Sequence, residues 1–274
     1  SSLNFTGCVK LATIGSNTFK DCVKLTSFDL NSFPGLQNLN NSCFIGCSAL
    51  TTVNFSGCTA LENVNENVFK NCVALTTANF SNCSELVNIK DNALDGCVEL
   101  TTVNLSSCGK LDKIYDNVFN GCVKLTTVTL TSCAKLTTIG ATAFNNCEKL
   151  AEMNFTGCTS LNDIASDCFS GCDILATANF TNCIGMTEIP TNLFKDFTEF
   201  TTINVTGCTN LATIGASAFE GCTKLETVDF SERNNLTTVN ADVFKNCTKL
   251  TSVDFDGCTS LATTNGTMFE GCTK

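Results

Sequence analysis

The sequence predicts a single solenoid domain of the α/β class over residues 1–274, in which about eleven coils of 25 residues stack on one another. Cysteine recurs with a period of 25 in two series. The first series is Cys22, Cys47, Cys72, Cys97, Cys122, Cys147, Cys172, Cys222, Cys247 and Cys272, and the second is Cys8, Cys58, Cys83, Cys108, Cys133, Cys158, Cys183, Cys208 and Cys258. Leucines from Leu11 to Leu261 keep this period in alternating steps of 14 and 11, and phenylalanines form a further column from Phe19 to Phe269.

The first half of each unit has the pattern of a short strand. Val53 and Phe55 alternate with Thr52, Asn54 and Ser56, which is the period of two expected when one face of a strand is buried. Equivalent strands of successive coils would stack in parallel at roughly 4.8 Å. The sequence therefore predicts a row of short parallel strands along one face of the solenoid.

The second half of each unit predicts a turn on the opposite face. Asn or Asp precedes small apolar residues and Phe69, and Gly or Asn precedes the cysteine at the position of Cys72. This order indicates a helical or 3₁₀ turn, closed by a residue that tolerates positive φ.

The repeat resembles a known family. The first half of the unit fits the leucine-rich-repeat template L-x-x-L-x-L-x-x-[N/C]-x-L. The longer pattern L-x-x-I-x-x-x-x-F-x-x-C-x-x-L runs from Leu136 to Leu150 and from Leu211 to Leu225, and it resembles the BspA-like leucine-rich-repeat (LRR) proteins of bacterial and protist surfaces. The resemblance covers essentially the whole chain and implies a non-enzymatic adhesin or binding protein, extracellular or at the cell surface. A second cysteine, as at Cys58, in a somewhat longer unit departs from the family pattern.

The cysteine columns predict core positions. Phe197 interrupts the first series, and Phe33 and Arg233 interrupt the second. A position that accepts either Cys or Phe is most simply apolar core, where free cysteine behaves as a small hydrophobe. Cys43 and Cys168 stand where other units have Val or Ala, which favours the same interpretation. Disulfides between adjacent coils are an alternative, whereas zinc is disfavoured because no C-x-x-C pair occurs.

Composition excludes several classes of function. The chain holds 16 Lys plus Arg against 26 Asp plus Glu, a net charge of −10, and no histidine. Histidine-dependent catalysis and histidine metal sites are therefore excluded. The chain also lacks the clusters of Lys and Arg with which proteins bind nucleic acids. No apolar run approaches the roughly 18 residues of a membrane span. We expect no cofactor, no nucleic-acid partner and no membrane span.

Catalytic and metal-binding patterns are sparse. No Ser/His/Asp set, glycine-rich phosphate loop or convergent acid pair is found, so we predict that the protein is not an enzyme. Asp229, Asp254 and Asp256 fall on the last two predicted strands and are the only candidates for a hard cation such as calcium. The alternative is a solvated acidic end.

A column of asparagines is predicted on the concave face, the usual binding surface of solenoids. The candidates for binding a host or matrix protein or a glycan are Asn54, Asn79, Asn104, Asn154, Asn179 and Asn204. The alternative is that these side chains hydrogen-bond to their own copies along the stack. Together with Asn4 they are also N-x-[ST] sequons and thus glycosylation candidates, unless the sequons are a by-product of repeating one unit.

The two ends of the sequence show no terminal caps, which solenoids normally need. One explanation is that the sequence is cut from a longer array. The other is that the last coil of one chain stacks on the first coil of the next, giving a head-to-tail homopolymer in the form of filaments or tubes. The residues predicted at this interface are Leu3, Phe5, Cys8, Met268, Phe269 and Cys272. Our leading hypothesis is a structural scaffold that assembles end to end, and the alternative is an adhesin or recognition module.

Overall fold

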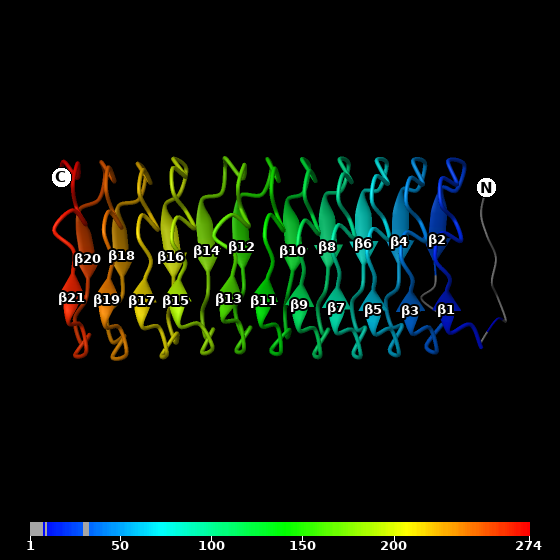
Figure 1. Cartoon of the computed structure of the whole chain (residues 1–274), viewed down its shortest axis with the longest axis horizontal. Helices are drawn as coiled ribbons and strands as arrows, with labels where there is room; N and C mark the ends of the chain where they lie inside the picture. The colour runs from blue at the N-terminus through cyan, green and yellow to red at the C-terminus, as the bar shows by residue number, and fades with distance from the viewer. Residues whose placement is uncertain (1–7, 9, 30–32) are drawn as a thin grey trace.

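The computed structural model describes residues 8, 10–29 and 33–274, and it arranges them as a row of stacked coils. About ten turns are described, and each contributes one three-residue strand and one two-residue strand (Figure 1). The two kinds of strand form two parallel rows along the molecule. The solenoid and its parallel strands are therefore confirmed.

The three-residue strands begin 25 residues apart. They are β2 (Ser27–Asp29), β4 (Thr52–Asn54), β6 (Thr77–Asn79), β8 (Thr102–Asn104), β10 (Thr127–Thr129), β12 (Glu152–Asn154), β14 (Thr177–Asn179), β16 (Thr202–Asn204), β18 (Thr227–Asp229) and β20 (Ser252–Asp254). Pairing is parallel and in register, so that Val53 lies opposite Ala78 and Asn54 opposite Asn79.

The two-residue strands follow the same period. They are β1 (Thr13–Ile14), β3 (Asn38–Leu39), β5 (Asn63–Val64), β7 (Asn88–Ile89), β9 (Lys113–Ile114), β11 (Thr138–Ile139), β13 (Asp163–Ile164), β15 (Glu188–Ile189), β17 (Thr213–Ile214), β19 (Thr238–Val239) and β21 (Thr263–Thr264). The first residue of each strand is exposed or half-buried. The second residue is buried in every one of these strands except β21.

The predicted helical or 3₁₀ turns, and with them the α/β class, were wrong: the part of the chain that the structure describes contains no helix. Asn67 and Asn71 have φ of 57° and 59°, whereas a right-handed helix needs negative φ at every residue. The N–H of Phe69 donates to Ala93 O of the next coil, while that of Lys70 closes a local turn onto Asn67 O. This face is therefore a series of turns cross-linked between coils, and the described fold is all-β. The expected positive φ before the cysteine was confirmed.

The core consists of stacked columns of identical residue types, as predicted. Leucines of successive coils, such as Leu50, Leu75 and Leu100, are fully buried. The rings of Phe119 and Phe144 stack with centroids 5.1 Å apart. Burying a side chain of this size contributes roughly 1.5–3 kcal/mol, so the columns supply much of the stability.

The strand ladders are interrupted at three places. In the described residues the three-residue strands form separate sheets of β2 to β10, β12 to β16 and β18 to β20, and the two-residue strands form sheets of β1 to β13 and β15 to β21. Pro190 accounts for the break between β13 and β15. At the equivalent position Ala165 donates its N–H to Ile139 O, and proline has no N–H to donate.

Candidate functional site

The outward side chains of the three-residue strands form a polar surface, which we call the strand face. On β4, Thr52 is exposed and Asn54 half-buried, while Val53 between them points into the core. Because the strands are in register, each of these positions repeats along the stack as a column.

The asparagines of this column close their own strands. Asn54 Oδ1 accepts a hydrogen bond of 3.1 Å from the N–H of Ser56 two residues later, which is the geometry of an Asx turn. The same bond recurs at Asn79, Asn104, Asn154, Asn179 and Asn204. Binding of a partner or a glycan through these six residues stays a prediction, and Asn4 lies outside the described residues.

Amide-to-amide bonds between copies occur in a different column. Asn88 Nδ2 donates to Asn63 Oδ1 at 3.1 Å, and Asn63 Nδ2 donates to Asn38 Oδ1 at 3.4 Å. These residues lie on the two-residue strands β3, β5 and β7. Sequence reasoning placed such a ladder on the strand face, although the recurrence of asparagine at positions 38, 63 and 88 was visible in the sequence.

A groove of about 350 Å³ lies on the strand face, where the ladder between β10 and β12 is interrupted. Its lining residues are Thr127, Val128, Thr129, Leu130, Thr131, Glu152, Asn154 and Thr156. Val128 remains buried, although it is 7% exposed against 1% for Val103 in the preceding coil. Our sequence analysis did not identify this site. The available signal was that Thr129 and Glu152 depart from their columns.

Most cysteines of the described residues are buried, which confirms their prediction as core positions, and the structure has them as free thiols. Each column adds a hydrogen bond that the sequence analysis missed. Cys97 Sγ lies 3.1 Å from Phe69 O and Cys108 Sγ lies 3.2 Å from Phe80 O, in each case a carbonyl of the preceding coil. Burial raises the pKa of Cys108 to about 12, so the thiol stays protonated and keeps its donor.

Arg233 takes over this bond at the place where it replaces a cysteine. Its Nη1 donates to Val205 O at 3.2 Å, the carbonyl 28 residues earlier that a thiol in that column would reach. Its Nε donates to Ser231 O at 2.9 Å, which fixes the guanidinium. The arginine therefore has a structural role at this position.

The side chains of two of the three candidate aspartates accept hydrogen bonds from the backbone. Asp229 and Asp254 lie opposite each other on β18 and β20. Asp229 Oδ1 accepts the N–H of Ser231, Asp254 Oδ1 accepts that of Asp256, and hydrogen bonding from Ser231 lowers the pKa of Asp229. No group of three or more His, Cys, Asp or Glu residues that could hold a metal ion is found within the described ranges.

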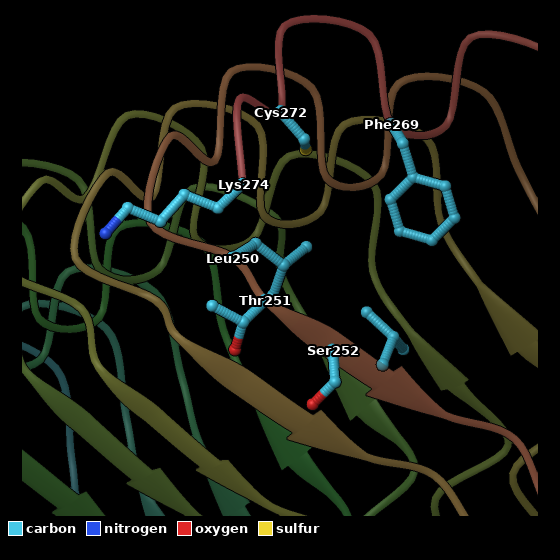
Figure 2. A pocket seen from close by; sticks show the side chains of 7 residues that line it. Leu250, Thr251, Ser252, Phe269, Cys272 and Lys274 are labelled. Atoms are coloured by element: carbon cyan, nitrogen blue, oxygen red, sulfur yellow. The ribbon is translucent and has the colours of Figure 1, made fainter.

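The C-terminal coil carries a second pocket, of about 290 Å³ (Figure 2). It is lined by Leu250, Thr251, Ser252, Val253, Phe269, Cys272 and Lys274. Phe269 stacks on Phe244 at 5.6 Å but remains 43% exposed, while Met268 is buried and Cys272 half-buried. At the other end Cys8 is exposed, and Leu3 and Phe5 lie outside the described residues. The described residues contain no helix with the length and apolarity of a membrane span.

The chain is similar to several solved structures of leucine-rich-repeat proteins. A leucine-rich repeat protein from Bacteroides ovatus is 21% identical, with 95% of this chain and 80% of that chain covered and a TM-score of 0.46. A leucine rich cell surface protein from Faecalibacterium prausnitzii is 19% identical, with 96% and 81% covered and a TM-score of 0.48. The T. pallidum leucine-rich repeat protein is 21% identical, with 73% and 77% covered and a TM-score of 0.49. No curated protein matches.

A family model accounts for nearly the whole chain. The BspA type leucine rich repeat region matches six times, over residues 2–86, 62–199 and 187–274. The match includes both halves of the repeat, the strands and the turns that close them. This chain therefore belongs to the family of BspA type leucine-rich-repeat proteins.

Proposed function

We propose that the protein is a non-enzymatic scaffold, extracellular or at the cell surface, that assembles end to end through its terminal coils. The observation that carries the proposal is the exposed apolar surface of the coil that contains Phe269. Phe269 is 43% exposed, whereas Phe244, its equivalent one coil earlier, is fully buried. Membership of the family supports the proposed location.

The physical basis is that a second copy, stacked on this coil, would supply the strand pairing and ring stacking that each internal coil receives from its neighbour. Among the described residues β20 and β21 each pair with a strand on one side only, and Phe269 stacks on a ring on one face only. A head-to-tail contact of this kind uses different surfaces on the two copies, so it propagates. Further coils of a longer array would cover the same surface in the same way.

The test is negative-stain electron microscopy with light scattering across a concentration series. We expect filaments or tubes that lengthen with concentration. Phe269→Asp should reduce them to single particles, because it places a charge on the stacking surface. Ile174→Asp is the matched control, since Ile174 is 40% exposed but lies in the middle of the array, and it should leave assembly intact.

Two results would contradict end-to-end assembly. Short single particles at every concentration would show that the coil does not recruit a second copy. Equal loss of assembly in Phe269→Asp and Ile174→Asp would show that association is lateral.

The alternative function is recognition of a host or matrix protein or glycan on the strand face. The groove between β10 and β12 favours it, because it is a hollow in the polar strand face. Recognition predicts that the chain stays monomeric and that Thr102→Lys, on the strand face, weakens binding to immobilised matrix proteins or glycans. Phe269→Asp should leave that binding unchanged.

A further inference from the structure

The groove lies between two strands that have separated while their neighbours remain paired. β10 ends one sheet and β12 begins the next, so each presents an edge toward the groove. Edge strands carry backbone N–H and C=O groups available to a ligand. Asn154 is exposed here, whereas Asn54 and Asn104 in paired strands are half-buried.

Two residue changes remove bonds that support regular coils at this point. Thr126 Oγ1 donates to Thr101 O of the preceding coil, but the next residue in that column is Ala151, which has no hydroxyl. Thr129 replaces the asparagine that forms the Asx turn in Asn104. Ala176 also lacks the hydroxyl although β12 and β14 are paired, so loss of the hydroxyl alone does not open the ladder.

A single carboxylate marks the groove. Glu152 is exposed and is the only charged residue among the lining side chains. In its column every other three-residue strand has a hydroxyl, namely Ser27, Thr52, Thr77, Thr102, Thr127, Thr177, Thr202, Thr227 and Ser252. The remaining polar lining consists of threonine hydroxyls and the Asn154 amide, whose oxygens accept hydrogen bonds, and Val128 and Leu130 line it with aliphatic carbon.

We propose that this groove binds a lysine or arginine side chain projecting from a protein partner. Glu152 is the counter-ion, the hydroxyls of Thr127 and Thr129 accept further hydrogen bonds from the cation, and the aliphatic stem packs on Val128 and Leu130. The net charge of −10 attracts basic partners over a longer range. The proposal rests on the recognition function and is independent of end-to-end assembly.

The test uses the full chain with N-acetyl-arginine amide, and with N-acetyl-citrulline amide as the neutral isostere. Methyl NMR should show saturable shift changes at Val128 and Leu130 with the arginine compound, weakening as salt is added, and little change with the citrulline compound. Glu152→Gln should weaken binding about tenfold, as expected when a charge-assisted hydrogen bond is lost. The control Glu188→Gln removes an exposed carboxylate from β15 and should bind like the parent chain.

The outcomes separate this proposal from the recognition function on which it rests. Equal responses to the arginine and citrulline compounds, or unchanged binding in Glu152→Gln, overturn the basic side chain as ligand. A neutral oligosaccharide that shifts the same methyl groups independently of Glu152 also overturns it, but leaves recognition standing. No response of the strand face to basic or neutral compounds, or to matrix proteins, overturns both.

Discussion

At the scale of single residues, the buried thiols combine packing with hydrogen bonding. Cys133 is fully buried, and its Sγ lies 3.3 Å from Leu105 O in the preceding coil. The substitution of Cys by Phe at two positions was sufficient to predict burial. It could not predict the thiol-to-carbonyl bond, because that bond depends on the offset between coils and not on residue type. For the same reason the role of Asn54 in closing its own strand became clear only in the structure.

Thiol reactivity should follow position along the stack. We expect a maleimide to label Cys8 fastest and the half-buried Cys22, Cys258 and Cys272 more slowly, because only the terminal coils expose sulfur. The buried cysteines should remain unlabelled in the native state. Mass spectrometry of peptides after timed labelling measures this order, and denatured protein is the control. Rapid labelling of Cys122 in native protein would contradict it.

Stability should fall in alkaline solution. Burial raises the pKa of Cys108 and Cys122 from 9.0 to about 12, so the folded state keeps protons that the unfolded chain loses. The stability contributed by these thiols is complete below pH 9 and is lost as pH rises from 9 toward 12. Thermal unfolding at intervals through this range should therefore show a steady decrease of Tm. A constant Tm up to pH 12 would contradict the expectation.

At the scale of elements, the turns show where sequence reasoning failed. Asn and Gly before Cys72 and Cys97 correctly predicted positive φ. A second left-handed residue four positions earlier, Asn67 in one coil and Asn92 in the next, was not recognised as a helix breaker. Two such residues leave no run of negative φ long enough for a helix, and the N–H of the Phe or Leu midway between them, as in Phe69 and Leu94, bonds to the adjacent coil. The separation of β10 from β12 was not predicted either, because it depends on losing several weak contacts together.

The groove should close when Thr129 and Ala151 are replaced by the residues that most other repeats have at these positions. Thr129→Asn combined with Ala151→Thr restores an Asx turn and an inter-coil hydroxyl bond, and we expect stabilisation of about 1–2 kcal/mol. Urea denaturation measures the stability. Hydrogen exchange should show new protection of the Leu130 N–H, with Leu105 as the internal reference because its N–H already donates to Thr129 O. An unchanged exchange rate at Leu130 would show that other residues hold the strands apart.

At the scale of the whole molecule, each described strand contacts only the equivalent strands of the neighbouring coils. Exposed ion pairs repeat this arrangement on the surface, as between Lys124 and Glu99 at 2.7 Å and between Lys224 and Glu199 at 2.6 Å. Such exposed pairs contribute roughly 0–1 kcal/mol each, so the buried columns dominate. Stability is then a sum of coils and interfaces, with weaker coupling where the strand ladders are interrupted. The sequence predicted the columns well because they repeat, and it predicted the interruptions poorly because each one is unique.

A substitution in the core should therefore destabilise mainly the coils around it. Phe219→Ala removes a buried ring stacked between Phe194 and Phe244 and should cost about 3–5 kcal/mol in its own coils. We expect hydrogen exchange to lose protection mainly in residues 158–274. Phe69→Ala, in the same column, is the matched variant and should lower protection before residue 125. Loss of protection over the whole chain in either variant would indicate a single cooperative unit.

The uniform register has a consequence for how the gene changes. Because the ladders join residues 25 apart, as Asn54 to Asn79, deletion or duplication of 75 nucleotides at any point in the repeat returns each column to phase. A change of one codon more or less turns every following side chain of a strand to the wrong face. Unequal recombination between repeats can thus lengthen or shorten the protein in whole coils, and variation among strains should come in multiples of that unit.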